Sequence, residues 1–181
     1  KVLPTMSHSA TLSEYSIPAS EALREIRSAE VDSVVTVPDW VQLSLHEQMA
    51  QSNSGLRVFP CANENQVLTV AAGLTIGGCR PLVMMQNQGL YNCINTLRAV
   101  CLDARIPMVL MVGQFGREYD KLAQPSTESK RSMVRLAEPL LQALGVPFHR
   151  LESRRDLHRI GAAFEQAQSE STAVVLLVGA P

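Results

Sequence analysis

The chain has 181 residues, of which 46% are hydrophobic and 18% are charged. This composition is typical of a water-soluble globular protein, and the length is enough for one domain with a sizeable buried core. The formal net charge of −1 gives no electrostatic basis for binding nucleic acid or an anionic membrane, and no apolar run is long enough to cross a bilayer. We therefore expect a protein with no nucleic-acid partner and no membrane partner.

The four cysteines form no CxxC pair, and none has a histidine at zinc-finger spacing. Cys61, Cys79 and Cys101 stand beside apolar or small residues. We interpret the cysteines as reduced thiols of a cytoplasmic protein rather than as disulfides or a metal site.

Helical and strand patterns alternate along the chain after an N-terminal segment rich in Ser and Thr. We expect residues 1–17 to form a flexible arm and residues 18–181 to form a single domain. Helical spacing of apolar residues occurs at 18–29, 40–51, 64–78, 93–105, 132–144 and 154–169. Short apolar runs that predict strands occur at 33–37, 56–59, 81–85, 107–112, 146–151 and 173–180.

This alternation predicts an α/β fold, in which a six-stranded, mainly parallel sheet forms the middle of a three-layer α/β/α arrangement. Ligands of such sheets bind in loops at the C-terminal ends of strands. Those loops are expected at 38–40, 60–64, 86–92, 113–130 and from 179 onward. We expect 86–92 to be a turn, and the helix at 132–144 to be kinked or broken before Pro139.

Several common site motifs are absent from the sequence. It contains no GxGxxG, no P-loop and no GxSxG, which argues against the usual dinucleotide and triphosphate sites and against a serine hydrolase. It also contains no Gly-Asp dipeptide.

Two segments are distinctive. In residues 63–73, NENQVLTVAAG, a glutamate opens a helix that runs into an Ala-Ala-Gly triplet, and residues 86–95, QNQGLYNCIN, follow an apolar strand. Together with residues 37–39, VPD, and 106–109, IPMV, they resemble the pyrimidine-binding domain of thiamine diphosphate-dependent 2-oxo-acid decarboxylases. The resemblance is closest to the sulfopyruvate and phosphonopyruvate decarboxylase group.

The resemblance implies that Glu64 is catalytic and binds the cofactor. In the family, a glutamate at this place hydrogen-bonds the aminopyrimidine ring and favours the tautomer that accepts the thiazolium proton. Without the neighbouring motifs, the preferred interpretation of Glu64 is a solvated first-turn residue that the helix dipole favours.

Asp39 ends a Val-Pro-Asp sequence that is similar to a VPDS turn of the family, although Trp40 stands in place of the serine. The resemblance implies that Asp39 faces the substrate and takes part in catalysis. The alternative is that Asp39 only caps the helix that follows it.

The turn at 86–92 matches a QNSGLGN-like turn, with the bulkier Gln88 and Tyr91 in place of serine and glycine. We therefore expect a substrate pocket that differs from that of either named decarboxylase. The resemblance implies substrate contacts for Asn87 and Asn92, and cofactor contacts for Gln86, Asn87, Gly89 and Leu90. The alternative is a polar turn that caps the next helix.

The loop at 113–121 is placed where the family often has an arginine-glycine segment. This implies that Arg117 contacts an anionic tail of the substrate. The alternative is an ordinary solvated charge.

The cofactors that the resemblance implies are thiamine diphosphate and Mg²⁺. Because the chain lacks the GDG…N pattern that holds magnesium and diphosphate in this family, we expect a separate β-type partner subunit to hold them, in a hetero-oligomer such as α2β2 or larger. The expected function is that of an α-type subunit of a decarboxylase acting on a sulfopyruvate-like or phosphonopyruvate-like 2-oxo acid.

Two alternatives stay open at this point. One is a non-catalytic or regulatory ligand-binding module on the same fold, because a fold does not fix a function. The other is a domain of a longer chain whose diphosphate-binding half lies downstream. The identity of the 2-oxo acid, and the choice between decarboxylation and carboligation, are also open.

Overall fold

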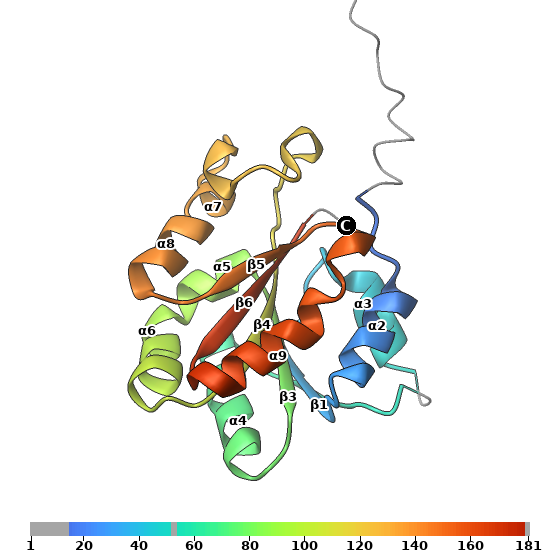
Figure 1. Cartoon of the computed structure of the whole chain (residues 1–181), viewed down its shortest axis with the longest axis vertical. Helices are drawn as coiled ribbons and strands as arrows, with labels where there is room; N and C mark the ends of the chain where they lie inside the picture. The colour runs from blue at the N-terminus through green and yellow to red at the C-terminus, as the bar shows by residue number, and fades with distance from the viewer. Residues whose placement is uncertain (1–14, 52–53, 180–181) are drawn as a thin grey trace, which may run out of the picture.

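The computed structural model describes residues 15–51 and 54–179 (Figure 1). Most of the predicted N-terminal arm, residues 1–14, lies outside the described residues, as do residues 180 and 181 after the last strand.

Six strands form one sheet in which every neighbouring pair is parallel. The strands are β1 (Ser33–Thr36), β2 (Arg57–Pro60), β3 (Pro81–Gln86), β4 (Met108–Gly113), β5 (Phe148–Leu151) and β6 (Ala173–Val178). Their order across the sheet is β2-β1-β3-β4-β6-β5. The predicted α/β class and the six strands are confirmed, and the sheet is entirely rather than mainly parallel.

Helices cover both faces of the sheet, so the predicted three layers are also confirmed (Figure 1). One face is covered by α2 (Ala19–Ser28), α3 (Leu43–Met49) and α9 (Arg159–Glu170). The other face is covered by α4 (Glu64–Ile76), α5 (Asn87–Asn92), α6 (Ile94–Leu97), the π-helical turn η1 (Arg98–Asp103) and α8 (Ala137–Leu144). The central strands β3, β4 and β6 are continuous apolar runs because both of their faces are buried.

The long segment between β4 and α8 is irregular, as its polar sequence predicts. It contains two short 3₁₀ helices, η2 (Tyr119–Lys121) and η3 (Ser126–Glu128), and the single turn α7 (Ser132–Arg135), and it is drawn in yellow and orange at the top of Figure 1. Another 3₁₀ turn, η4 (Arg154–Asp156), precedes α9.

Three local predictions differ from the structure or are refined by it. The segment at 86–92 forms helix α5 rather than a simple turn, and the helix predicted from residue 40 begins only at Leu43. The predicted break before Pro139 is confirmed, and it falls at Leu136, between α7 and α8. Pro139 thereby lies in the first turn of α8, where an amide hydrogen has no acceptor within the helix.

The strand order creates a switch point between β1 and β3. The connection from β1 leads to β2 on one side, whereas the connection from β3 leads to β4 on the other side. The crevice beyond the C-terminal ends of these two strands is the expected ligand site of an open parallel sheet. Most of the residues singled out in the sequence stand at or after the ends of β1, β2 and β3 and therefore lie along this edge, whereas Arg117 follows β4.

Candidate active site

The start of α4 is fixed by side-chain capping on both sides of Glu64. Asn63 accepts the backbone N–H of Gln66 at 3.0 Å, and the side chain of Gln66 accepts the backbone N–H of Ala62 at 2.9 Å. This reciprocal cap makes Glu64 the first residue of the helix. The partial positive charge of the helix N-terminus stabilises a carboxylate at this position.

Glu64 packs directly against the backbone of α5 at Gly89. A Cβ atom placed on Gly89 would lie 2.6 Å from Oε1 of Glu64 and 2.7 Å from its Cδ. The side-chain amide of Asn92 donates a hydrogen bond to Oε2 of Glu64 at 3.0 Å. The structure therefore brings together three of the predicted residues, Glu64, Gly89 and Asn92, from the segments after β2 and β3.

The two oxygens of the Glu64 carboxyl differ in their surroundings. Oε2 accepts the bond from Asn92, whereas Oε1 accepts no hydrogen bond from any residue that the structure describes. Glu64 is half-buried. One carboxyl oxygen is therefore held by the protein, and the other is available to a ligand.

Asn87 is fully buried, and its side chain ties the turn to other segments. Its Nδ2 donates to the backbone oxygens of Phe115 and Met133, both at 3.1 Å, and its Oδ1 accepts the backbone N–H of Gln88. This network joins α5 to the loop after β4 and to α7. The predicted contacts of Asn87 with cofactor and substrate stay predictions, and they compete with these internal bonds.

The other two predicted cofactor residues occupy different surroundings. Leu90 has no exposed area and belongs to the core between the sheet and α4. Gln86 is the last residue of β3, is half-buried, and pairs in register with Gly113 at the end of β4. Their cofactor contacts stay predictions.

Asp39 is 7% exposed, and its carboxyl is held by Gln42 and by a backbone hydrogen bond from Val41. Gln42 donates its backbone N–H to Oδ1 of Asp39 at 2.9 Å and its side-chain amide to Oδ2 at 2.7 Å. Burial raises the pKa of the Asp39 carboxyl, and the hydrogen bonds from Gln42 oppose this rise. The N-cap residue of α3 is Gln42, so Asp39 caps the turn before this helix rather than the helix itself.

Asp39 also lies against the end of β4. A Cβ atom on Gly113 would lie 2.7 Å from Oδ1 of Asp39 and 2.8 Å from Cβ of Val41. Glycine at this position therefore lets the loop after β1 pack over the neighbouring strand end. Sequence reasoning did not single out Gln42, although its spacing of three residues from an aspartate is a turn-capping signal.

The Arg117 side chain is buried and forms its contacts within the protein. This side chain has no exposed area, and it contacts the carboxylate of Glu152 at 2.9 Å and the backbone oxygen of Gln124 at 2.6 Å. This ion pair fastens the loop after β4 to the end of β5. The predicted contact of Arg117 with an anionic substrate would require the ion pair to open.

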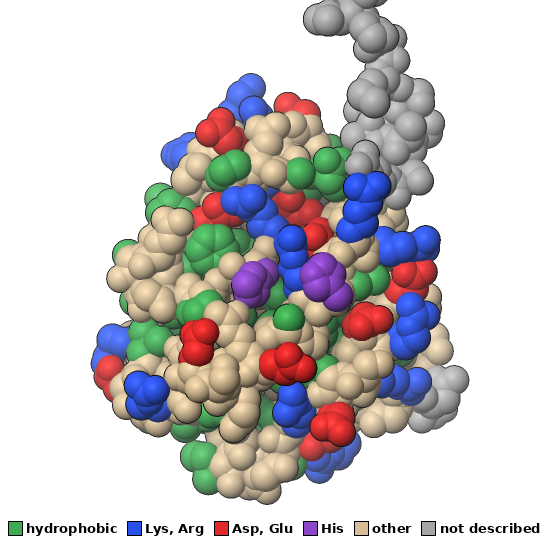
Figure 2. Space-filling view, in the orientation of Figure 1, with side chains coloured by type: hydrophobic (Ala, Val, Ile, Leu, Met, Phe, Trp, Pro, Cys, Tyr) green, Lys and Arg blue, Asp and Glu red, His purple; other side chains and the backbone are tan. Residues whose placement is uncertain are grey.

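The described residues contain no cluster of His, Cys, Asp or Glu that could hold a metal ion, and none of the described helices combines the length and the apolar character that crossing a membrane requires. Cys93 and Cys101 are buried, and burial raises the pKa of each thiol to about 12. Acidic and basic side chains are interspersed on the face shown in Figure 2.

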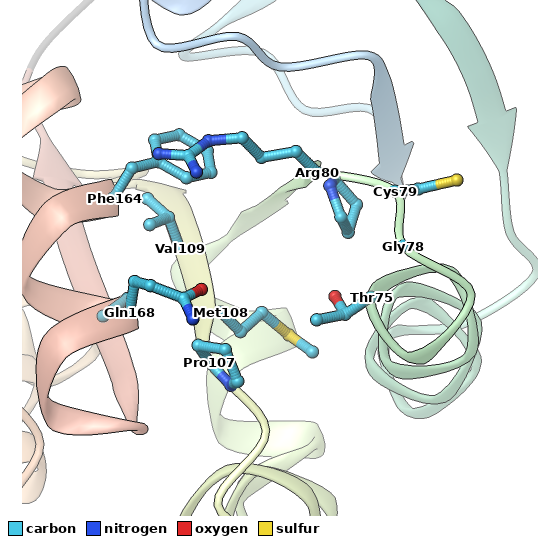
Figure 3. Close-up of a pocket in the computed structure, with 11 residues that line it drawn as sticks. Thr75, Gly78, Cys79, Arg80, Pro107, Met108, Val109, Phe164 and Gln168 are labelled. Atoms are coloured by element: carbon cyan, nitrogen blue, oxygen red, sulfur yellow. The ribbon is translucent and has the colours of Figure 1, made fainter.

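A cavity of about 320 Å³ lies away from Glu64. It is lined by the end of α4, the starts of β3 and β4, and α9, so it is at the opposite edge of the sheet (Figure 3). The guanidinium of Arg80 stacks over the ring of Phe164 there, with its carbon 5.0 Å from the ring centre. A smaller cavity of about 90 Å³ lies beside Trp40, at the edge that carries Asp39.

Comparison with known proteins identifies relatives along most of the chain. The chain matches no protein-family model. It is 27% identical over 164 residues to the sulfopyruvate decarboxylase subunit alpha of Methanothermobacter thermautotrophicus, a match that covers 90% of this chain and 96% of that protein. It is 25% identical over 131 residues to the same subunit of Methanococcus maripaludis, covering 72% of this chain and 75% of that one.

Further matches extend the relationship to larger proteins. A region of 105 residues, 58% of this chain, is 31% identical to 26% of the phosphonopyruvate decarboxylase of Streptomyces hygroscopicus. Benzoylformate decarboxylase from Polynucleobacter necessarius superposes with a TM-score of 0.67 at 17% identity, over 89% of this chain. The 2-oxoglutarate:ferredoxin oxidoreductase from Magnetococcus marinus superposes with a TM-score of 0.66 at 11% identity, over 91% of this chain.

The chain spans 29% of each of these two solved chains, and at such low identity the superpositions establish the shared fold alone. The sequence matches and the fold together confirm the resemblance predicted from residues 63–73 and 86–95. The chain is thus a homologue of sulfopyruvate decarboxylase alpha subunits and of phosphonopyruvate decarboxylase, with the fold of a thiamine diphosphate enzyme domain.

Proposed function

We propose that this chain is the α-type subunit of a thiamine diphosphate-dependent decarboxylase that acts on a sulfopyruvate-like or phosphonopyruvate-like 2-oxo acid. The observation that carries the proposal is the Glu64 carboxyl, which lies against Gly89 with one oxygen bound by Asn92 and the other without a protein partner among the described residues. The similarity to the Methanothermobacter thermautotrophicus alpha subunit over 96% of its length supports the same function.

The residues around Glu64 fit the aminopyrimidine part of the cofactor. A carboxyl oxygen free of protein partners is the group that such a ring nitrogen needs, and the absent side chain at Gly89 keeps that carboxyl close to α5. When bound, thiamine diphosphate supplies the thiazolium nucleophile. The chain's own part is to hold a proton between Glu64 and the ring, and to keep Asp39, whose pKa burial raises, beside the substrate.

The other half of the cofactor carries the diphosphate and, with it, magnesium. The chain has no Gly-Asp dipeptide, and the described residues hold no metal-binding cluster. We therefore assign magnesium and the diphosphate to a β-type partner subunit, in an α2β2 or larger assembly. Trp40 and Phe115, which are 72% and 43% exposed on loops at this edge, are apolar surface that such a partner would cover.

A calorimetric titration of thiamine diphosphate and magnesium tests this proposal, first with the chain alone and then with the partner subunit. We expect binding only with the partner. The loaded complex should then release carbon dioxide from sulfopyruvate or phosphonopyruvate, and Glu64→Gln should remove most of this turnover. Glu165→Gln, at an exposed position on α9, is the matched control and should change nothing.

Two outcomes would contradict the proposal. Tight binding of the cofactor by the lone chain would reveal a diphosphate site within it. Unchanged turnover in the Glu64→Gln complex would favour the regulatory module on the same fold. The cytoplasmic location and the assignment of residues 18–181 to one pyrimidine-binding domain stay predictions.

A further inference from the structure

We infer that Asn92 is a positioning residue for Glu64 rather than a ligand of the substrate, an inference that rests on the function proposed above. The contact is direct, because the Asn92 side-chain amide donates to Oε2 of Glu64 at 3.0 Å. A neutral amide donor fixes the direction of a carboxylate without adding a charge of its own. The resemblance to the decarboxylase family had instead implied a contact with the substrate.

The position of Asn92 is itself fixed by a second pair of side chains. Asn65, the residue after Glu64, directs its Nδ2 toward the backbone oxygen of Asn92 at 3.5 Å, and its Oδ1 accepts the hydroxyl of Thr96 at 2.5 Å. The first turn of α4 is thereby linked to the end of α5 and to α6 by two adjacent residues. Glu64 and Asn92 are therefore held in register by contacts that do not involve a ligand.

The bond to Asn92 fixes the plane of the Glu64 carboxyl and leaves its second oxygen without a protein donor among the described residues. Oε2 is occupied, and the close approach of Gly89 limits the movement of the rest of the carboxyl. Without the Asn92 donor, the carboxyl would be free to rotate about its last side-chain bond. The fraction of molecules in which a Glu64 oxygen is directed at the cofactor would then fall, although the substrate would bind as before.

A positioning role and a substrate contact predict different kinetics. We expect Asn92→Ala, in the complex with the partner subunit and saturating thiamine diphosphate, to lower kcat about tenfold while KM changes less than about twofold. Asn92→Asp should be more damaging, because it replaces the donor with a second carboxylate beside Glu64. Sulfopyruvate and phosphonopyruvate are the substrates to use.

Asn95→Ala provides the matched control. Asn95 is exposed, lies three residues further along, and its side chain accepts hydrogen bonds from Arg98 rather than contacting Glu64. This variant should retain both kinetic constants. A higher KM with unchanged kcat in Asn92→Ala would overturn the inference in favour of a substrate contact, and equal effects of Asn92→Ala and Asn95→Ala would also refute it.

The hydrogen bond between Asn92 and Glu64 can also be tested without cofactor or turnover, in a protein in which Asn92 is unchanged. In ¹⁵N NMR spectra of the chain, Glu64→Gln should move the side-chain amide signals of Asn92 and leave those of Asn95 in place. Unmoved Asn92 signals would show that the bond is not formed. If Glu64→Gln keeps full turnover, the proposed function is wrong. If Glu64→Gln loses turnover but Asn92→Ala has a normal kcat, only the positioning role of Asn92 is wrong.

Discussion

The contact between Gly89 and Glu64 leads to a stability prediction with a definite sign. Gly89 lies in the middle of α5, where replacing glycine by alanine normally stabilises a helix by about 1 kcal/mol. Here the new Cβ would lie 2.6 Å from Oε1 and 2.7 Å from Cδ of Glu64. Overpacking of this kind costs about 1–3 kcal/mol. Gly89→Ala should therefore lower the free energy of unfolding by up to about 2 kcal/mol instead of raising it.

The sign should reverse when Glu64 is shortened. The three atoms nearest to the added Cβ all belong to the Glu64 side chain beyond its own Cβ, so Glu64→Ala removes the clash. In that background Gly89→Ala should stabilise the chain by about 0.5–1 kcal/mol, which makes the coupling between the two positions about 1–3 kcal/mol. Urea unfolding followed by circular dichroism gives the four free energies that the cycle requires.

Gly73→Ala is the control for helix propensity, because a Cβ at Gly73 meets no atom within 4 Å. It should stabilise the chain by about 0.5–1 kcal/mol with or without Glu64. If Gly89→Ala destabilises the chain equally in both backgrounds, the glycine is required for a reason other than the Glu64 carboxyl, and the reasoning is refuted.

Three further predictions concern buried ionisable groups. Because burial raises the pKa of Asp39, ionisation of this carboxyl costs stability as the pH rises through that pKa. The stability of Asp39→Asn relative to the parent should therefore be greater at pH 7 than at pH 4. A difference in urea midpoint between the two proteins that is the same at both pH values would contradict this. Arg117→Ala leaves Glu152 buried without its cation and should cost about 3–5 kcal/mol, measured by urea unfolding, whereas a loss below about 1 kcal/mol would mean that the pair is solvated. Cys93 and Cys101, with pKa values of about 12, should resist Ellman's reagent at pH 8 until the chain is unfolded, and rapid native labelling of all thiols would refute their burial.

The parts of the fold that sequence predicts well are those whose local pattern leaves one solution. The runs at β3, β4 and β6 are too apolar for anything but buried strands, and the asparagine cap before Glu64 defines the start of α4. The helical form of 86–92 is different, because the segment is polar and contains a glycine. Its shape depends on Asn87, which bonds to segments 28 and 46 residues away.

The same distinction applies to the candidate site. The topology rule for parallel sheets is enough to bring Asp39, Glu64 and the turn at 86–92 to one edge. The partners of the individual side chains could not be predicted, because Asn92 is 28 residues from Glu64 and Arg117 is 35 residues from Glu152. Arg117, which the resemblance assigned to a substrate, is therefore found in an ion pair that the sequence could not reveal.

The origin of the contacts around Glu64 separates the roles of the two proposed subunits. Glu64 is fixed by the cap of α4, by Gly89 and by Asn92, all of which belong to this chain and are in contact without a partner. We therefore expect the geometry of the proposed activating carboxyl to be formed before assembly. We expect the partner subunit to contribute the diphosphate and magnesium site and to exclude water from the edge that carries Trp40 and Phe115, rather than to reposition Glu64.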